Sequence, residues 1–408
     1  MSGLDPTHRR DKPTDVAVIT QFFPPEGQGG GYRWEKLIDN MDDDNLRFQV
    51  ICPPPTYPYG EHDRSYRPWQ RDHTNDTPVT RLWTYQPGSD VGSLGRILNY
   101  GVFSVLATLY VLLNFWRYDC VVTMSTPHTT FLPGAVAKLL GRAWIVDIFD
   151  LWLDNAADLG YVEEDSIGFW IVAKLEAAAM HHADQIIVLT PTMAQFYQEK
   201  YDLSGERFTA VPFGVDRDLF SPPAHQDAVN RIVYLGNLGA FYAFEPYLRA
   251  FAHLDDRYEL YFVGWGEERE RLEDLCDDLG ISDRVTFTGR VPRKEVPELL
   301  ASATLNLVPL ETDYQLDYAR PTKMLEGMAV GLPYIASPLQ EIQHVTEESE
   351  GGLVVENDPS AISDAMEQLL SNPDLRRNMK KRGVQFIEQE HRWGVLSDRM
   401  QSVIAGTV

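Results

Sequence analysis

Two cations and a carboxylate open the segment Arg320 to Ser337, RPTKMLEGMAVGLPYIAS, which is otherwise apolar. Charged side chains are seldom buried unless they are paired or used. If a helix begins near Thr322, its first turn offers free N–H groups and a positive dipole end to an anion. Arg320 and Lys323 could then hold a diphosphate, and Glu326 could accept both hydroxyls of a ribose. The alternative is a surface Lys–Glu pair worth about 0.2–0.5 kcal/mol.

Glycine-rich turns follow several expected strands. GNLG begins at Gly236 and GWG at Gly264, each at the end of an apolar run. Gly236, Asn237 and Gly264 could therefore lie close to a phosphate or to the edge of a nucleotide. Glycine is also common in ordinary tight turns, so the two successive turns carry more weight together than either does alone.

A third glycine run, GQGGG, ends at Gly31, after the first expected strand. Glycines admit a ligand close to the backbone, and the N-terminus of the following helix favours an anion. We therefore predict that Gly30, Gly31 and Arg33 contribute to the site that binds the diphosphate. The run is not a GxGxxG fingerprint, which argues against a dinucleotide, and a flexible loop is the alternative.

His128 follows the strand-like run CVVTM, where it could bind a sugar hydroxyl or transfer a proton, or be a structural loop histidine. Asp147, Asp150 and Asp154 follow the next run. No histidine near them in the sequence completes a metal site, and Asp147 is expected on the strand itself. We expect Asp150 to accept a hydrogen bond from a substrate hydroxyl or to orient a partner, with Trp152 as an apolar wall.

These residues are placed by strand-like runs that alternate with helical segments. DVAVIT is followed by a helix from about Arg33, and after the polar linker VPFGVDRDLFSPPAHQDAVN the alternation starts again. This pattern predicts an α/β protein with two doubly wound, Rossmann-like domains that face each other across a cleft, each with a parallel sheet. Active sites in such sheets lie at the carboxyl ends of the strands.

The 408 residues include 60 acidic and 36 basic ones, for a net charge of −24. This acidic excess argues against a nucleic-acid partner and suggests a salt-adapted organism. Three widely spaced cysteines make neither a disulfide framework nor a metal cluster. The polar N-terminus lacks the apolar core of a signal peptide, so we expect a cytoplasmic protein.

An apolar segment, Ile97 to Trp116, is flanked by Arg96 and Arg117. About 20 apolar residues can span a bilayer. Four polar residues dilute the segment: Asn99, Ser104, Thr108 and Asn114. Three interpretations stay open: a helix buried beside a sheet, a helix dipping into the membrane interface, and a spanning helix.

In order along the chain, the motifs FFPPEGQGGGYR, PTYPYG, VDIFDLW, VPFGVD, YLGNLG, VGWGEERERLEDL, VTFTGRVP and RPTKMLEGMAVGLPYIAS resemble the retaining glycosyltransferases of family 4, which have the GT-B fold. The likeness is to the subgroup that transfers amino or deoxy sugars during surface-polysaccharide assembly. It implies acceptor binding in residues 1–210, donor binding in residues 211–385, and a last helix, 386–408, that packs back on the first domain.

The resemblance also implies a nucleotide diphosphate sugar as co-substrate, with UDP favoured over GDP, and neither a metal nor another cofactor. Glu326 would bind the ribose and Lys323 the diphosphate, and the anomeric configuration would be retained. We predict His128, Asp150 and Lys323 as the catalytic residues. Electrostatic stabilisation of the departing diphosphate would supply most of the catalysis.

Several positions depart from the family pattern. Tyr318 stands where the family often has a first glutamate, and Asn237 and Tyr242 stand near its usual Arg and Lys. Phe149 replaces the subgroup's arginine before the aspartate. The diphosphate charge would then be met by Lys323, Arg320 or Arg33.

Related transferases often use lipid-linked acceptors, so we expect residues 97–116 to hold the protein peripherally on the cytosolic face of a membrane, near a polyprenyl-phosphate glycan. Three alternatives are a transferase with a soluble acceptor, a nucleotide-sugar epimerase and a non-catalytic binding subunit. Only His128 and the Asp150 region could serve an epimerase as acid and base.

Overall fold

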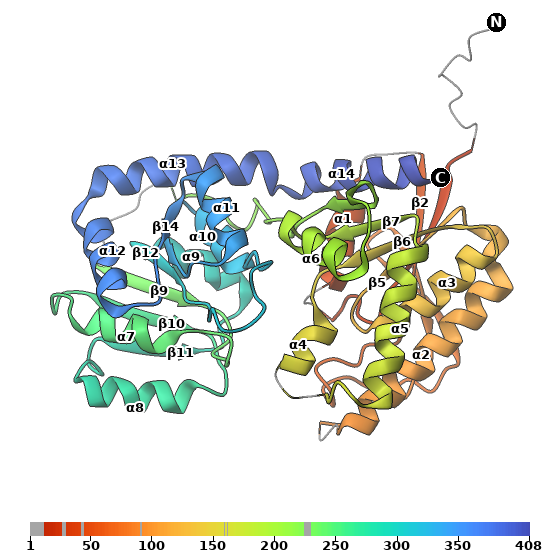
Figure 1. The fold of residues 1–408 in the computed structure, drawn as a ribbon, viewed down its shortest axis with the longest axis horizontal. Coiled ribbons are helices and arrows are strands. Elements are labelled where there is room, and N and C mark those ends of the chain that lie inside the picture. Colours follow the sequence, from red (N-terminus) through yellow and green to blue (C-terminus); the bar gives the residue numbers. More distant parts are fainter. Residues whose placement is uncertain are drawn as a thin grey trace, which may run out of the picture. The chain divides into compact units, whose positions relative to one another are not determined.

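The computed structural model describes residues 12–26, 30–41, 45–89, 92–158, 160, 162–223 and 230–408. The chain forms two compact units (Figure 1). Unit 1 comprises Met1–Leu189, Ala194–Val211 and Ser397–Val408, and unit 2 comprises Thr190–Met193 and Pro212–Leu396. Each unit has its own sheet with helices packed against it, which confirms the prediction of two Rossmann-like α/β domains.

The sheet of unit 1 has the strand order β3-β4-β2-β1-β5-β6-β7-β8. Its parallel strands are β1 (Thr14–Ile19), β2 (Leu46–Cys52), β4 (Thr77–Leu82), β5 (Cys120–Met124), β6 (Ala143–Ile148), β7 (Gln185–Val188) and β8 (Phe208–Ala210). The edge strand β3 (Trp69–Thr74) is antiparallel to β4, so the sheet is parallel except at this edge. The reason is the tight turn at Asn75, whose φ is 51°, since so short a connection can join only antiparallel strands.

The helices of unit 1 are α1 (Gly30–Asp39), α2 (Ser93–Asn114), α3 (Phe131–Leu139), α4 (Trp152–Asp158), α5 (Ile167–His182), most of α6 (Pro191–Tyr201) and, from Ser397 onward, α14 (Trp393–Thr407). Helix α1 begins at Gly30, three residues before the predicted start. The Ser397 hydroxyl donates to the Leu37 carbonyl over 2.8 Å, which fastens the end of the chain to α1.

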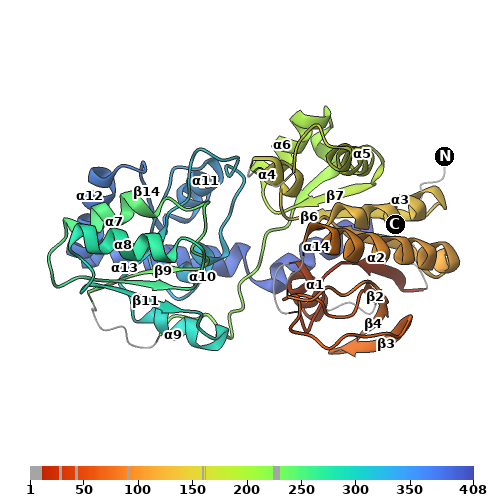
Figure 2. The same ribbon diagram turned by 90° about the horizontal axis from the view of Figure 1, so that it is seen from below.

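Helix α2 packs one face on the sheet and leaves the other exposed. Phe103, Ala107 and Val111 are fully buried in the core beside β1, β2 and β5. Only 28% of the most apolar stretch of the helix is buried, and by length and composition it is the one described helix that could cross a membrane. The helix therefore lies beside the sheet but is buried along one face only. Helices α2 and α3 lie side by side in both views (Figures 1 and 2).

The polar residues of α2 do not interrupt its exposed face. Asn99 accepts from Gln21 over 2.9 Å and donates to the Tyr85 carbonyl over 2.6 Å, and it is fully buried. Thr108 and Asn114 each donate to a carbonyl one turn back in the same helix, at 2.7 Å and 2.9 Å. These polar side chains therefore bond to buried groups or to the backbone of the helix itself.

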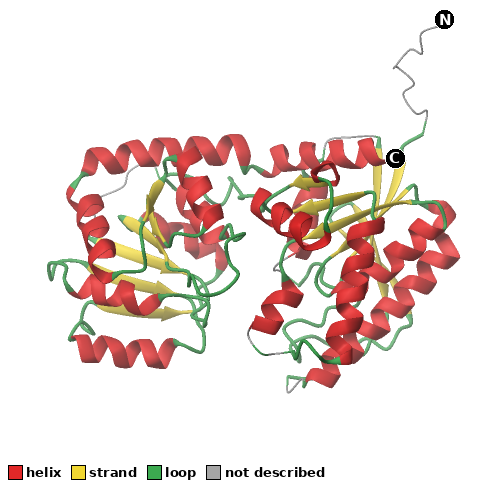
Figure 3. Cartoon of the chain, viewed as in Figure 1, coloured by secondary structure: helices red, strands yellow, loops and turns green. Residues whose placement is uncertain are grey.

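The sheet of unit 2 is parallel throughout (yellow arrows in Figure 3), with the order β11-β10-β9-β12-β13-β14. Its strands are β9 (Arg231–Leu235), β10 (Glu259–Val263), β11 (Val285–Gly289), β12 (Leu305–Val308), β13 (Tyr334–Ala336) and β14 (Gly352–Val354). The helices are α7 (Phe244–Ala252), α8 (Arg269–Leu279), α9 (Val296–Ala301), α10 (Thr322–Ala329), α11 (Gln340–Ser349), α12 (Pro359–Ser371) and α13 (Pro373–Glu390). Strand order reverses between β9 and β12, and ligands bind doubly wound sheets at such a switch point.

Candidate active site

Two glycine turns meet at the switch point of unit 2. Gly236 follows β9 and has φ +139°, and Gly264 follows β10 and has φ +148°. A Cβ on Gly264 would lie 1.8 Å from the Gly236 carbonyl oxygen, and a Cβ on Gly236 would lie 2.5 Å from Lys323 Nζ. Both positions require glycine, because a side chain would part the two turns or displace the lysine.

Lys323 lies in the first turn of α10 with its ammonium group buried. Its Nζ donates to the Tyr234 hydroxyl over 2.8 Å and lies over the rings of Tyr234 and Tyr242, at 4.4 Å and 4.0 Å from their centroids. Among the described residues, no carboxylate comes within ion-pair distance of Nζ. Burial lowers the pKa of Lys323, although Tyr242 and Glu326 oppose this. A buried cation held only by hydroxyls and ring faces is ready to bind an anion.

Glu326 lies one turn farther along α10 and is 7% exposed. Its Oε1 accepts from Arg293 Nη2 over 2.8 Å. Burial raises the pKa of Glu326, while Arg293 and Lys323 hold it down. Lys323 and Glu326 therefore do not form the surface ion pair that was the alternative in the sequence analysis. Lys323 bonds to Tyr234, and Glu326 bonds to Arg293.

The contacts of Arg320 link parts of unit 2 to one another. Its guanidinium donates from Nε to Glu341 over 2.9 Å and also from Nη2 to the same oxygen. Nη1 lies 3.2 Å from His391 Nε2, which must accept because a guanidinium only donates. His391 therefore carries its proton on Nδ1, which donates to the Phe213 carbonyl over 3.0 Å. These contacts fasten the start of α10 to α11 and to the segment after α13.

The positions that depart from the family pattern have local roles. Tyr242 supplies one of the two rings around the Lys323 ammonium. The Asn237 carbonyl accepts the Tyr234 hydroxyl, which orients that hydroxyl's oxygen toward Lys323. The Tyr318 carbonyl accepts from Thr190 over 3.0 Å. An aromatic enclosure thus surrounds the Lys323 ammonium.

The switch point of unit 1 lies between β1 and β5, and α1 and His128 follow these two strands. Gly30 and Gly31 are buried there: a Cβ on Gly30 would lie 2.5 Å from Met124 Cε, and one on Gly31 would lie 2.3 Å from the Phe22 carbonyl oxygen. Close packing thus accounts for both glycines, and their predicted role at the donor stays a prediction. Gly27, Gln28 and Gly29 lie outside the described residues.

Arg33 forms a completely buried ion pair with Asp147. Nη1 lies 3.1 Å from Asp147 Oδ2, which also accepts from Trp34 Nε1 over 2.7 Å, and Nη2 donates to the Val211 carbonyl. Burial raises the pKa of Asp147, and Arg33 and Trp34 oppose this rise. Arg33 therefore joins α1, β6 and the chain after β8, whereas the sequence suggested that it points toward the donor.

His128 begins a short 3-10 turn and is fully buried. Its Nε2 lies 2.7 Å from Glu176 Oε2, and its ring lies 5.6 Å from that of Trp152, the predicted apolar wall. The other Glu176 oxygen accepts from Lys200 over 2.9 Å and from Tyr201 over 2.6 Å. The Nδ1 atom of His128 is buried and has no hydrogen-bond partner in the described part of the chain.

The three aspartates near β6 are separated by their partners. Asp147 is buried with Arg33, Asp150 Oδ1 accepts from Asn155 over 2.9 Å, and Asp154 binds Lys200 through both oxygens at 2.8 Å. No group of three potential metal ligands gathers within the described residues. The predicted role of Asp150, to bind a substrate hydroxyl or to orient a partner, stays a prediction.

Glu176, Lys200 and Arg293 were not anticipated from the sequence. Glu176 is a lone carboxylate within the apolar run IGFWIVAKLEAAAM, and a charge in such a setting signals a buried partner. Arg293 follows β11 in GRVPRKE, at a strand's carboxyl end, where the other candidates were sought. Lys200 lies on a polar helix and carries no comparable signal.

The pKa of Glu176 leads to a prediction about stability. Burial raises this pKa, but hydrogen bonds and charge from His128, Lys200 and Tyr201 outweigh burial and lower it from 4.5 to about 2. Since the folded pKa is the lower one, the ionised network contributes about 3 kcal/mol above pH 4.5, which is lost as the pH falls toward 2. Urea unfolding of Glu176→Gln and wild type should differ most at neutral pH. A difference that is constant down to pH 2 would contradict this.

The chain matches two family models that follow one another. Residues 28–214 match the Glycosyl transferase 4-like domain, and residues 216–386 match Glycosyl transferases group 1. The chain is 29% identical over 394 residues to a D-inositol 3-phosphate glycosyltransferase of Corynebacterium jeikeium, covering 88% of this chain and 89% of that protein. It is 22% identical over 379 residues to the probable glycosyltransferase WbjE of Pseudomonas aeruginosa, covering 87% and 89%.

Solved structures show the same fold. A sucrose-phosphate synthase from Thermosynechococcus elongatus superposes with a TM-score of 0.74 at 20% identity, covering 96% of this chain and 98% of that one. Anabaena HepE in complex with UDP superposes with a TM-score of 0.69 at 13% identity, covering 96% and 100%. These neighbours have the GT-B fold of glycosyltransferases, and the two Rossmann-like domains of this chain have the same fold. The chain belongs to the glycosyltransferase family described by the group 1 and 4-like models, which confirms the resemblance seen in the sequence.

Proposed function

We propose that the protein transfers a sugar from a nucleotide diphosphate sugar to a lipid-linked glycan with retention of the anomeric configuration. One observation carries the donor assignment: the buried Lys323 ammonium, which has no carboxylate partner among the described residues, lies one turn from Glu326 at the switch point of unit 2. The Anabaena HepE structures, of the same fold, contain UDP and UDP-glucose, which supports a nucleotide sugar as the ligand.

In this proposal the first turn of α10 binds the diphosphate. Lys323 neutralises its charge, and the N–H groups at the helix start add donors. Glu326 keeps one oxygen on Arg293 and offers the other to the ribose diol. The acceptor hydroxyl attacks the anomeric carbon from the face that the diphosphate leaves, the bond to the diphosphate breaks, and the hydroxyl proton passes to a departing phosphate oxygen. Lys323 stabilises that developing charge without a metal ion.

Donor titration tests this assignment. Calorimetry with UDP, GDP and their common sugars, in molar KCl, should show binding of one nucleotide, with UDP expected. Glu326→Ala should weaken that binding by about tenfold to 100-fold, because a charged acceptor of two hydroxyls is lost. Glu347→Ala, at an exposed position of α11, is a matched control and should bind normally. Binding of no nucleotide would contradict the proposal, whereas tight binding without turnover would favour a non-catalytic subunit.

The lipid-linked acceptor is proposed from an exposed apolar face of unit 1. Helices α2, α3 and α5 pack in a row, and large apolar side chains point outward from them: Leu94, Ile97, Leu98, Val105, Leu109, Leu112, Leu113, Leu132, Leu139, Ile167, Trp170 and Ile171. A face with this many exposed apolar side chains marks a membrane or partner surface. It would place the enzyme peripherally on the cytosolic side of a membrane.

A soluble acceptor is the competing possibility, since the Corynebacterium relative is named for an inositol phosphate. Replacing several exposed leucines of α2 by serine should reduce transfer to a polyprenyl-linked acceptor and leave donor binding intact. Unchanged activity in that variant, with wild type found only in the soluble fraction at low and high salt, would favour the soluble acceptor.

A further inference from the structure

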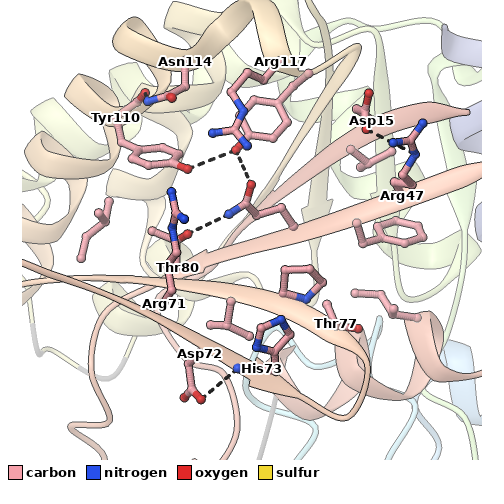
Figure 4. Close-up of a pocket in the computed structure, with 18 of the residues that line it drawn as sticks. Asp15, Arg47, Arg71, Asp72, His73, Thr77, Thr80, Tyr110, Asn114 and Arg117 are labelled. Carbon is pink, nitrogen blue, oxygen red and sulfur yellow. Dashed lines mark hydrogen bonds and ion pairs between the residues drawn. The ribbon is translucent and has the colours of Figure 1, made fainter.

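A hollow of about 1640 Å³ lies at the amino ends of the strands in unit 1 (Figure 4). It is bounded by the starts of β1 and β2, by the β3–β4 hairpin, and by the second half of α2. His128 and α1 follow the carboxyl ends of β5 and β1. The hollow is therefore at the opposite edge of the sheet from the candidate acceptor site, and the proposed transferase chemistry does not use it.

The two walls of this hollow differ in chemistry. One wall is apolar and comes from Leu109, Leu113 and Trp116, which are 48%, 66% and 62% exposed. Leu109 and Leu113 belong to the outward surface of α2 that the proposed membrane contact uses, and Trp116 follows the end of this helix. The apolar wall is thus continuous with that surface.

The other wall is lined by hydroxyl and amide groups. Tyr118 donates to Gln49 over 2.8 Å, Gln49 donates to Thr80 over 2.7 Å, and the Tyr110 hydroxyl lies 3.3 Å from that of Tyr118. Figure 4 shows this chain of contacts as dashed lines. It holds Tyr110 and Tyr118 in place without using the nearby arginines.

Two guanidinium groups in the hollow are available for an anion. Asp72 forms an ion pair with Arg81, and Asp15 forms ion pairs with Lys12 and Arg47. Asp39 accepts from Asn75 near the hairpin turn, where Asp76 and His73 also lie. Arg71 stacks over Trp69, and neither Arg71 nor Arg117 forms an ion pair within the described residues. Figure 4 shows both arginines reaching toward the side of the hollow where Tyr110 lies.

We propose that this hollow binds one anionic lipid of the membrane, with its phosphate on Arg71 and Arg117 and its chain along Leu109, Leu113 and Trp116. Charge complementarity carries this assignment: two arginines with no carboxylate partner among the described residues stand beside an apolar wall in a chain of net charge −24. A free phosphate would leave the apolar wall in water. The inference rests on the proposed membrane contact of α2, and it assigns a headgroup preference to that contact.

Vesicle flotation of the whole protein at fixed salt tests the proposal. Wild type should bind phosphatidylcholine vesicles with about 10 mol % phosphatidic acid some tenfold more tightly than vesicles of phosphatidylcholine alone. The double variant Arg71→Gln/Arg117→Gln should lose this preference and keep its binding to phosphatidylcholine. The control Arg377→Gln, an exposed arginine paired with Asp374 in unit 2, should behave as wild type.

Other outcomes overturn the proposal, and they separate it from the membrane contact itself. No preference in wild type, or a preference that survives in the double variant, excludes an anionic lipid at this site. Full competition by inorganic phosphate at millimolar concentration would identify a free anion instead. A lipid-free dimer that Leu109→Ser/Leu113→Ser dissociates would show that a second copy covers the face. Loss of all vesicle binding in that leucine variant, with both arginines present, tests only the membrane contact.

Discussion

Replacing Arg33 by leucine should lower the free energy of unfolding by about 3–5 kcal/mol, because it leaves Asp147 buried with an uncompensated charge. The pair is fully buried, and Arg33 also donates to the Val211 carbonyl. Urea unfolding at neutral pH measures the loss. Nucleotide binding should persist wherever the variant is folded, because the candidate donor residues belong to unit 2.

The double variant Arg33→Leu/Asp147→Leu is the matched control. Since it removes both buried charges, it should recover much of the stability that the single variant loses. A folded Arg33→Leu protein of normal stability that no longer binds the nucleotide would reverse this interpretation. Such a result would show that Arg33 contributes to the donor site, as the sequence analysis predicted.

Lys323→Met should weaken binding of the nucleotide diphosphate by about 100-fold or more, because charge-assisted contacts to a phosphate are among the strongest polar contacts. The melting temperature of the ligand-free protein should not fall. A buried ammonium with no carboxylate partner among the described residues costs free energy in the folded state, and methionine fills a similar volume between Tyr234 and Tyr242. Calorimetric titration and thermal unfolding of the same preparation measure the two effects.

Arg320→Met provides the contrast. It leaves the buried Glu341 carboxylate without its guanidinium, so it should destabilise unit 2 and affect nucleotide binding less than Lys323→Met does. Lys323→Arg should not restore binding fully, because a planar guanidinium is bulkier than the ammonium group that packs against Gly236 and the two rings. A large stability loss in Lys323→Met would show instead that the lysine is a structural residue.

Local sequence patterns were enough to predict several parts of the site. The alternation of apolar runs with amphipathic helices predicted two parallel α/β units, and the turns after the strands identified the neighbourhood of Gly236, Gly264 and His128. The predicted start of α10 near Thr322 is confirmed at Thr322. These features depend on side-chain periodicity and on turn residues within a few positions of one another, which are visible in a single sequence.

The partner of each charged side chain was decided only by the tertiary structure. Arg33 and Asp147 are 114 positions apart, Glu176 and His128 are 48 apart, and Arg293 and Glu326 are 33 apart. Strand order and helix packing bring these residues together, and neither leaves a local pattern in the sequence. Arg320 and Lys323 show this most clearly: both precede the same apolar segment, yet Glu341 pairs with the arginine while tyrosine rings surround the lysine. The sequence by itself determined where charge would gather, and the packing of distant elements determined which charge remains available to a ligand.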